Sequence, residues 1–454
     1  MSDETSMRVL FGTDGIRAKA GAYPLDAATM FALGEALAHR VSGAPVLLGM
    51  DTRESGPEIA RSLSAGIVQG GGTAVFAGVI PTPGVAYLCR MTDAAAAISI
   101  SASHNPFADN GVKIFGHDGM KVPDSVEEQI EDELRALRRE DVIIPAIALT
   151  ENIELIEKYE RFLIAGVPPG ALSGRKVVLD AGHGAAYRIA PEVFRRAGAE
   201  VVVIHDAPNG RNINENAGAL HPEHLAKVVV EQSADYGVAF DGDADRAIFV
   251  DDAGKVRDGD EVIYLWAQAL HGRGELRGDC VVTTVMSNFG FEKQLGADGI
   301  RLARAQVGDK YVLELMLQLD SILGGEQSGH IIDRSVHTTG DGIHTAVVFG
   351  TILAERKQPF SQLHTFDPMP QLLLNQKVRA KPPLDSLPRY QAAHASALTA
   401  LEGRGRILVR YSGTENVVRV MAEGEDGTLI TRIAEELREL LKEEIESSQS
   451  PDAL

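Results

Sequence analysis

Short apolar runs alternate with segments of helical periodicity through most of the chain. Between the first two runs, Ile59, Leu63 and Ile67 recur every fourth residue and define one apolar face of a helix. Ser55 and Glu58 stand three residues apart at the start of this helix, which is the spacing of a capping box. The alternation predicts βα units around a largely parallel sheet. The runs expected to form its strands are residues 46–50, 74–80 and 94–100.

The same alternation returns twice further along the chain, so we expect three similar α/β domains in series. A segment with Pro168, Pro169 and Gly170 marks the break before the second domain. A loop with three prolines between residues 359 and 370 marks the end of the third. The expected strands are 176–180, 200–204 and 236–240 in the second domain, and 280–285 and 321–323 in the third.

From about Gln371 the order of elements changes. A strand at 372–378 and a helix at 390–401 are followed by two strands on either side of 412–414 and by an amphipathic helix through 429–440. The predicted fold class is therefore α/β: three similar α/β domains with mixed, mostly parallel sheets, and a smaller C-terminal α+β domain. The expected domains are 1–158, 159–256, 257–367 and 368–454.

Composition narrows the class of protein. The 454 residues carry 44 lysines and arginines against 64 acidic residues, and this net charge of −20 disfavours nucleic acid as a partner. No uncharged apolar run reaches the length that spans a bilayer, so we expect no membrane partner. Residues 1–7 are polar and acidic, unlike a secretory signal, so we expect a cytoplasmic protein. Cys89 and Cys280 belong to no Cys-x-x-Cys pair and are interpreted as small buried hydrophobes.

The segment Ser101–Lys113 combines a hydroxyl, an imidazole and an ammonium. Ser103 follows an apolar strand, and open α/β sheets bind ligands at that edge. No Gly-x-Ser-x-Gly elbow is present, and side chains of adjacent residues in extended backbone point apart, so Ser103 and His104 make a poor hydrolase dyad. Phosphate monoesters hydrolyse very slowly without catalysis. The favoured interpretation is a serine that carries a phosphoryl group, with Ser101 as a turn residue.

Asp241, Asp243 and Asp245 alternate along the chain, so in extended backbone their carboxylates face one side. Gly242 would let the backbone approach an ion closely. Ligation by oxygen alone suits Mg²⁺. An EF-hand calcium loop is excluded because Arg246 occupies the position of its glycine. Taken alone, the segment is also compatible with a solvated acidic turn.

Three more loops offer groups for anions or sugar hydroxyls. Each is also compatible with an ordinary polar turn. The candidate residues are Arg17 in the turn Gly12–Arg17, the acceptors and donors of Gly324–His330, and Arg410, Ser412, Thr414 and Arg419 near the C-terminus.

Taken in order, these five segments resemble the α-D-phosphohexomutase family over nearly the whole chain. Gln327 is typical of members that act on glucosamine phosphates, whereas members that act on mannose or glucose phosphates tend to differ there. The resemblance implies four domains around a central cleft, each contributing one motif. The residues that carry it are Gly12–Arg17, Ser101–Pro106 with Lys113, Asp241–Arg246, Gly325–His330 and Arg410–Glu415.

The resemblance also implies a role for each candidate residue. Ser103 would carry the phosphoryl group and, with Asp241, Asp243 and Asp245, would hold one Mg²⁺. Lys113 and His104 are the candidates for general acid or base. The residues expected to line the reacting phosphate are Lys113, Arg17, His104 and Arg246; those expected to contact the sugar are Glu326, Ser328 and His330; and those expected to hold the distal phosphate are Arg410, Ser412, Thr414 and Arg419.

Two positions depart from the family pattern. Lys310 stands where arginine is frequent, which keeps the charge toward the substrate but weakens bidentate recognition. Asn416 replaces a common proline. Neither departure changes the expected membership.

The implied reaction interconverts glucosamine 6-phosphate and glucosamine 1-phosphate through a phosphoserine and a 1,6-bisphosphate. It makes the protein an isomerase. A sugar 1,6-bisphosphate or an activating kinase would prime Ser103, and the likeness suggests a homodimer. Three alternatives remain: the same chemistry on glucose or mannose phosphates, a metal-dependent sugar phosphatase, and a sugar-phosphate sensor without catalysis.

Overall fold

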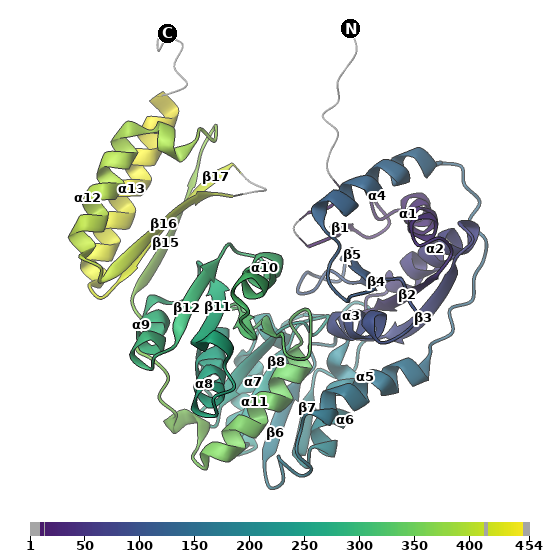
Figure 1. Ribbon diagram of the computed structural model, residues 1–454, viewed down its shortest axis with the longest axis horizontal. Coiled ribbons are helices and arrows are strands. Elements are labelled where there is room, and N and C mark those ends of the chain that lie inside the picture. The colour runs from purple at the N-terminus through teal and green to yellow at the C-terminus, as the bar shows by residue number, and fades with distance from the viewer. Residues whose placement is uncertain (1–9, 13, 413–415, 448–454) are drawn as a thin grey trace. The chain divides into compact units, whose positions relative to one another are not determined.

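The predicted fold class is confirmed in a computed structural model, which describes residues 10–12, 14–412 and 416–447 (Figure 1). Three mixed α/β sheets follow one another, and a fourth, antiparallel sheet with two helices ends the chain. The chain divides into two compact units. The first comprises Met1–Thr284 and Ala303–His364, and the second Val285–Leu302 and Thr365–Leu454. The four domain boundaries and the central cleft stay predictions.

The first sheet has the strand order β1-β5-β4-β2-β3, with a parallel core of β4, β2 and β3 and two antiparallel strands at one side. Its strands are β1 Ile16–Lys19, β2 Pro45–Met50, β3 Thr73–Val79, β4 Ala96–Ile100 and β5 Asp109–Gly116. The helices of this part of the chain are α1 Ala27–Arg40, α2 Gly56–Gln69, α3 Thr82–Arg90, α4 Asp124–Leu137 and α5 Ile153–Ala165.

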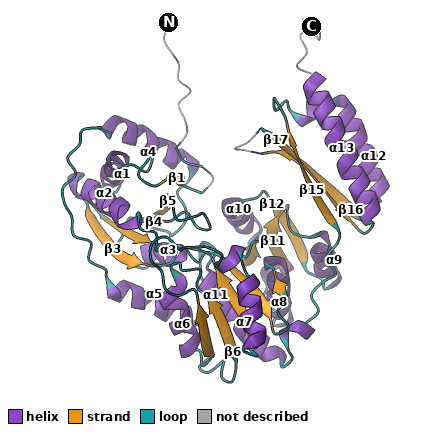
Figure 2. Cartoon of the chain, turned by 180° about the vertical axis from the view of Figure 1, so that it is seen from behind, coloured by secondary structure: helices purple, strands orange, loops and turns teal. Residues whose placement is uncertain are grey.

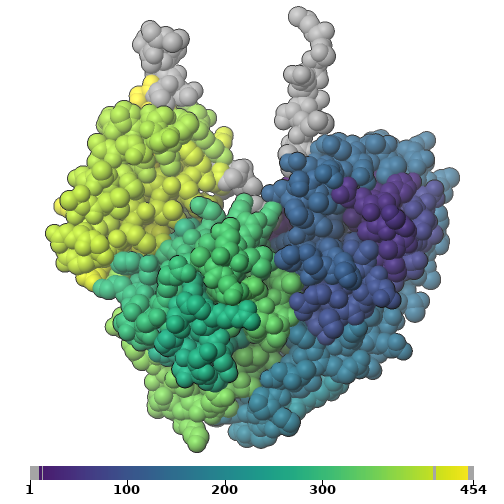
Figure 3. All heavy atoms as spheres, viewed as in Figure 1, coloured from purple at the N-terminus to yellow at the C-terminus, as the bar shows by residue number. Residues whose placement is uncertain are grey.

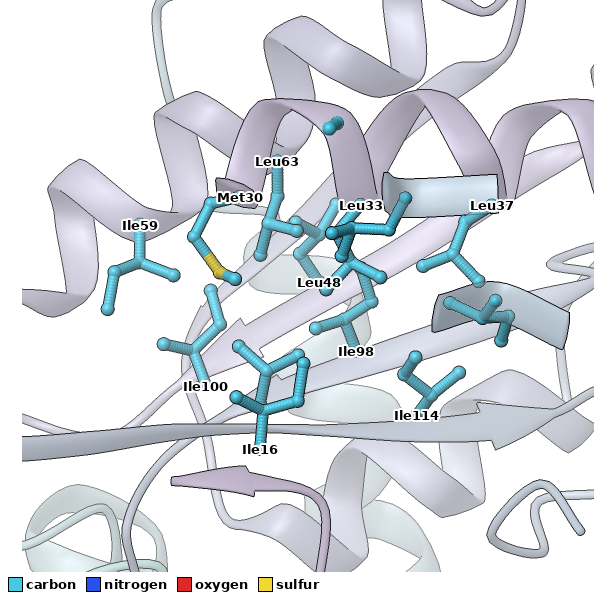
Figure 4. Packing of buried hydrophobic residues seen from close by; sticks show 14 of the residues in the cluster. Ile16, Met30, Leu33, Leu37, Leu48, Ile59, Leu63, Ile98, Ile100 and Ile114 are labelled. Carbon is cyan, nitrogen blue, oxygen red and sulfur yellow. The ribbon is translucent and has the colours of Figure 1, made fainter. Parts of the chain in front are cut away.

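An apolar layer joins this sheet to α1 and α2 (Figure 4). Met30 and Leu33 from α1 and Leu63 from α2 point at Leu48 and Ile98 of the central strands. All five side chains are fully buried. Each such side chain contributes about 1.5–3 kcal/mol when it leaves water, so this layer fixes the strand ends that precede the candidate serine.

The second sheet repeats the arrangement, with the order β10-β9-β8-β6-β7 and a parallel core of β8, β6 and β7. Its strands are β6 Lys176–Asp180, β7 Glu200–Ile204, β8 Tyr236–Phe240, β9 Ala247–Asp251 and β10 Val256–Arg257, with helices α6 Ala186–Arg196 and α7 Glu223–Glu231. The three parallel strands have the bounds that the apolar runs predict.

The third sheet has the order β12-β11-β13-β14. Its strands are β11 Cys280–Thr284, β12 Arg301–Ala305, β13 Leu323–Gly325 and β14 Ile331–Asp333, with helices α8 Gly259–Gly272, α10 Asp309–Leu319 and α11 Gly342–Arg356. The helix α9, Phe289–Ala297, belongs to the second unit. The strand expected at 321–323 instead begins at Leu323 and continues through two glycines. The buried Ser321 hydroxyl donates to the carbonyls of Cys280 and Leu323, so it closes the turn before the strand.

In the second unit, α12 Pro388–Leu401 and α13 Gly427–Ser447 cover one face of the sheet β15-β17-β16 (Figure 2). Its strands, β15 Gln371–Lys377, β16 Gly405–Tyr411 and β17 Val417–Gly424, pair antiparallel throughout. Short 3₁₀ turns span Gly218–Leu220, Arg277–Asp279 and Phe360–Gln362 in the first unit, and Leu384–Ser386 in the second.

The start of α2 differs from the sequence prediction. Ser55 precedes α2, but its side chain makes no capping hydrogen bond and instead accepts from Asn110 Nδ2 at 2.8 Å, so the predicted capping box is wrong.

Within the first unit, the residues around the first sheet pack against those around the third, as the space-filling view shows (Figure 3). One contact there is a hydrogen bond that Thr338 Oγ1 donates to the carbonyl of Gly119. In the part of the chain that is described, no helix combines the length and apolarity needed to cross a bilayer.

Candidate active site

Ser103 lies in a tight loop between β4 and β5, with a left-handed φ of 51° and a buried side chain. Its backbone N–H donates to Ser101 Oγ at 2.9 Å, and Ser101 in turn donates to Asp51 at 2.6 Å. Ser101 therefore shapes the turn, as expected. The Ser103 hydroxyl is directed at Asp241, donating to Oδ2 at 2.7 Å, so the serine meets the aspartate cluster.

Arg53 supports the serine loop, the segment 103–109 between β4 and β5, and the sequence did not single it out. Its guanidinium is buried, pairs with Asp51 at 2.8 Å and donates to four backbone carbonyls of the loop. Asn214 Nδ2 donates to two of the same carbonyls, those of Ser103 at 2.9 Å and Asn105 at 3.2 Å. Arg53 lies just after the end of β2, and β2 is the neighbour of β4, the strand that precedes Ser103. A polar residue just after an expected strand was the only indication of this role that the sequence offered.

Asp241, Asp243 and Asp245 are buried, and one ligating atom from each lies within 4.8 Å of the others. The expected extended backbone is wrong: the segment is a turn after β8, in which Ala244 has a φ of 54° and donates its N–H to the carbonyl of Asp241. Thr82 fixes the turn by donating its N–H and its hydroxyl to Asp243, the latter at 2.6 Å. A turn, and not alternation, brings the carboxylates together.

The cluster fits a divalent cation. Burial and the neighbouring carboxylates Asp245 and Asp243 raise the pKa of Asp241 well above its ordinary value. The Oδ1 atoms of Asp243 and Asp245 are buried and accept no hydrogen bond from any residue in the described ranges. Leaving such acceptors unsatisfied costs about 1–3 kcal/mol each. An oxygen-only donor set with two free carboxylate oxygens is the chemistry that Mg²⁺ prefers.

Lys113 reaches the cluster from β5. Its buried ammonium lies 3.1 Å from Asp243, 3.4 Å from Asp245 and 3.3 Å from Asp14. Burial opposes the charge, but these three carboxylates outweigh burial and raise the pKa of Lys113 well above its ordinary value. The carboxylates therefore favour the ammonium form of Lys113 beside the aspartate cluster.

His104 lies on the other side of Ser103. Its Nδ1 is 3.3 Å from the serine hydroxyl, so the expectation that adjacent side chains point apart is wrong, because the left-handed Ser103 turns the backbone. Burial and the guanidiniums of Arg246 and Arg17 lower the pKa of His104. A neutral imidazole at this place can accept a proton from Oγ.

Arg17 and Arg246 bring two further cations. Arg17, at the start of β1, pairs with Asp14, and Arg246 Nε lies 3.8 Å from Asp245. Asp14 also binds Lys121 at 2.5 Å, and Lys121 binds Asp309 at 2.7 Å. The sequence did not single out Lys121 and Asp309. Their ion pair joins the part of the first unit that holds the first sheet to the part that holds the third.

The loop between β13 and β14 brings Glu326, Ser328 and His330 to this region. His330 lies 3.6 Å from Asp245 and 3.7 Å from Asp309. Burial opposes its charge, but these carboxylates prevail and raise the pKa of His330 to about 9. Ser328 donates to Glu326 at 3.2 Å, so the two side chains already form a polar pair.

Two side chains that the sequence linked to substrate recognition, Gln327 and Lys310, already bind other residues of the protein. Gln327 Nε2 donates to Asp258 Oδ2 at 2.9 Å, and Asp258 caps α8. Lys310 is ion-paired with Asp124 at the start of α4. Either side chain would have to share or leave its partner to reach a ligand.

Arg410 and Arg419 are paired across β16 and β17 of the second unit. Two cations side by side repel, and burial together with Arg419 lowers the pKa of Arg410. The Ser412 backbone lies at the end of β16, where its carbonyl accepts from Lys381 at 2.7 Å. Guanidinium pairs of this kind are suited to binding an anion, so the predicted phosphate contact stays a prediction. Thr414 lies outside the described residues.

Fold and site together define a phosphohexomutase-type enzyme architecture, and comparison with known proteins identifies the family. Residues 8–141, 157–254, 258–368 and 373–440 match the phosphoglucomutase/phosphomannomutase α/β/α domains I, II and III and the C-terminal domain of that family. The chain belongs to the phosphoglucomutase/phosphomannomutase family.

Two relatives that match this chain over nearly their full length are phosphoglucosamine mutases. The chain is 46% identical to the phosphoglucosamine mutase of Solibacter usitatus (strain Ellin6076), over 96% of this chain and 99% of the relative. It is 47% identical to the phosphoglucosamine mutase of Symbiobacterium thermophilum, with the same coverage. Among solved structures, a phosphoglucomutase/phosphomannomutase family protein from Burkholderia thailandensis has the same fold, with a TM-score of 0.79 at 22% identity over 96% of this chain and 97% of that one.

Proposed function

We propose that this protein is a phosphoglucosamine mutase, which interconverts glucosamine 6-phosphate and glucosamine 1-phosphate through a phosphoserine at Ser103. The observation that carries the proposal is the 2.7 Å contact between the Ser103 hydroxyl and a buried aspartate cluster, with Lys113 beside it. The names of full-length relatives at 46% and 47% identity support the choice of sugar.

Each half-reaction moves one phosphoryl group and one proton. The P–Oγ bond of phospho-Ser103 breaks as a bond forms from phosphorus to O1 of the sugar phosphate, and the proton of that hydroxyl passes to Oγ. The 1,6-bisphosphate then reorients, and Oγ attacks the phosphorus at O6, returning one proton to the sugar oxygen. His104 Nδ1 lies 3.3 Å from Oγ. It passes the proton to Oγ in the first half-reaction and takes it from Oγ in the second.

The cations around the serine stabilise the phosphoryl group in transit. Lys113, Arg17 and Arg246 bring cationic side chains to this place, and positioned positive charge is the main catalytic device for phosphoryl transfer. Mg²⁺ held by Asp241, Asp243 and Asp245 with an oxygen of the phosphoserine would add further neutralisation of phosphate charge. A sugar 1,6-bisphosphate or a kinase would prime Ser103.

Substrate recognition is assigned to two places. Glu326, Ser328, His330 and Lys310 would meet the sugar and its near groups, and Arg410, Ser412, Thr414 and Arg419 the phosphate that does not react. In this proposal the four domains are 1–158, 159–256, 257–367 and 368–454, and the enzyme works in the cytoplasm as a homodimer, without nucleic acid or membrane.

Glucose or mannose phosphate is the second candidate substrate, because Gln327 is engaged by Asp258 and the sugar loop therefore offers fewer free donors. The test compares kcat/KM for glucosamine, glucose and mannose 6-phosphates, each with Mg²⁺ and its own 1,6-bisphosphate. A preference for glucosamine 6-phosphate is expected; preference for a neutral hexose keeps the mechanism and rejects the sugar assignment.

The mechanism is tested separately. Ser103→Ala should retain the fold and lose turnover, and mass spectrometry of the wild-type protein should place a phosphate on Ser103. Substantial mutase activity in Ser103→Ala would refute the phosphoserine route. Release of inorganic phosphate at the rate of substrate loss would identify a phosphatase, and ligand binding without turnover a sensor.

A further inference from the structure

Three histidines gather at the carboxyl ends of the strands of the second sheet, apart from the aspartate cluster. His183 follows β6, His205 follows β7 and His224 lies in the first turn of α7. The rings of His183 and His205 are 5.2 Å apart between centroids, and those of His205 and His224 are 5.0 Å apart. Nothing in the proposed mechanism uses them.

Asp180 lies beside His205 at ion-pair distance. The imidazole Nδ1 lies 3.0 Å from Asp180 Oδ2, and the carboxylate raises the pKa of His205. Asp180 itself is fully buried, and its oxygens accept from the backbone N–H groups of Gly182 at 2.8 Å and Gly218 at 3.1 Å. A carboxylate that fixes one ring nitrogen leaves the other aimed outward, which is the orientation that protein metal sites use.

The free nitrogen of His205 faces a second imidazole. His205 Nε2 and His224 Nδ1 lie 3.1 Å apart. In tetrahedral zinc sites with Zn–N distances of about 2.0–2.1 Å, two ligand nitrogens stand about 3.3 Å apart. The observed separation thus allows either one shared proton or, after a small opening, one metal ion between the two lone pairs.

We propose that His205 Nε2 and His224 Nδ1 bind one divalent transition-metal ion, of the zinc and copper class, with Asp180 orienting His205. Imidazole ligands suit these metals, whereas Mg²⁺ prefers oxygen. Within the described residues only the aspartate triad brings three ligating atoms within 4.8 Å, so water completes the shell here. Nδ1 of the neighbouring His183 is buried and has no hydrogen-bond partner in the described residues, but His183 does not bring a third ligand atom within 4.8 Å of this pair.

The test uses the full chain in excess Mg²⁺, which fills oxygen sites, and Cu²⁺ as the probe. Electron paramagnetic resonance should show superhyperfine coupling to two imidazole nitrogens, and Zn²⁺ should compete for the same site. His224→Gln should lose the two-nitrogen signal and weaken Cu²⁺ binding at least tenfold. The His224 ring is exposed, so this variant should fold. Asp180→Asn should weaken binding about 10–100-fold while keeping both ligands.

A matched control exists in α8. His271 Nδ1 lies 2.8 Å from Asp279 Oδ1, a histidine–carboxylate pair at the surface. His271→Gln should leave the copper spectrum and affinity unchanged. The proposal is overturned if His224→Gln keeps the two-nitrogen coupling and the affinity of the wild type, or if His271→Gln loses as much.

Discussion

Arg53 offers the sharpest test of how the serine is positioned. The side chain touches no reacting atom, but its guanidinium has more contacts to the serine loop than any group discussed above. Lysine at this position keeps the charge and has three donors. The acceptors that Arg53 serves are the Asp51 carboxylate and the carbonyls of Ser103, Asn105, Pro106 and Asp109.

Arg53→Lys therefore leaves at least two of these five acceptors without this donor. An acceptor that is buried and finds no other donor costs about 1–3 kcal/mol unless the loop moves. Movement relieves this cost but displaces Ser103, and a displacement of about 1 Å can cost about 10²-fold in rate. We expect kcat to fall by one to two orders of magnitude, about 10–100-fold, with a smaller change in KM.

Asn214 supplies the internal check, because it donates to two of the same carbonyls. It has a φ of 59°, so Asn214→Gly removes the donor without left-handed strain. The double variant should lose more than the two single losses combined, with a coupling of about 0.5–3 kcal/mol in the activation free energy. The assay is steady-state mutase kinetics, with circular dichroism to confirm folding.

The control is Arg211→Lys. Arg211 is an exposed arginine that pairs with Glu54 at 2.6 Å, and exposed pairs contribute about 0–1 kcal/mol. Its kinetics should match the wild type. If a folded Arg53→Lys protein has wild-type kcat, the position of the serine does not depend on this guanidinium. If the Arg53 and Asn214 losses are simply additive, the two side chains do not support the loop jointly.

Three further perturbations test other parts of the molecule. Burial lowers the pKa of His337 to about 3, and Nδ1 accepts from the Thr338 N–H at 2.9 Å, so the folded state keeps this ring neutral. The contribution of the neutral His337 ring to the free energy of unfolding is complete above the ordinary pKa of about 6.5 and falls by about 1.4 kcal/mol per pH unit below it. In thermal melts from pH 7 to 5, the Tm of His337→Asn should therefore fall less steeply than that of the wild type, and equal slopes would exclude the effect. Lys310→Ala should raise KM whereas Asp124→Ala should not, because we assign Lys310 to the substrate; equal effects in steady-state kinetics would limit Lys310 to its ion pair. Arg410→Lys should raise KM with little change in kcat, since a lysine cannot bind a phosphate in two places at once, and a fall in kcat alone would contradict a role in binding the unreacting phosphate.

The strands were predictable where burial makes them continuous apolar runs. β6 and β8 have the bounds expected from the sequence, because a parallel strand covered on both faces needs apolar side chains throughout. The edge strand β7 is only partly buried, but its valines still mark the expected bounds. β13 was misplaced for the converse reason: two of its three residues are glycines, Gly324 and Gly325, and glycine carries no apolar signal.

The candidate site was predictable in its residue types but not in its supports. Ser103, Lys113 and the aspartates are chemically distinctive, and the structure brings them together in the first unit. Arg53 acts mainly on backbone carbonyls, and no sequence pattern shows which carbonyls a distant side chain will meet. Thr82 likewise reaches Asp243 only because α3 begins beside the aspartate turn.

Gly242 has a packing role that the sequence did not indicate. The sequence suggested that glycine lets the backbone approach an ion, and this stays a prediction. A Cβ at position 242 would also lie 2.6 Å from the carbonyl oxygen of Ser103 and 2.9 Å from Asn214 Nδ2. The missing side chain therefore lets the aspartate turn and the serine loop, which come from two different sheets, approach closely enough for the Oγ–Asp241 contact. Catalytic geometry at this site depends on the packing of two turns as much as on the charged groups that they carry.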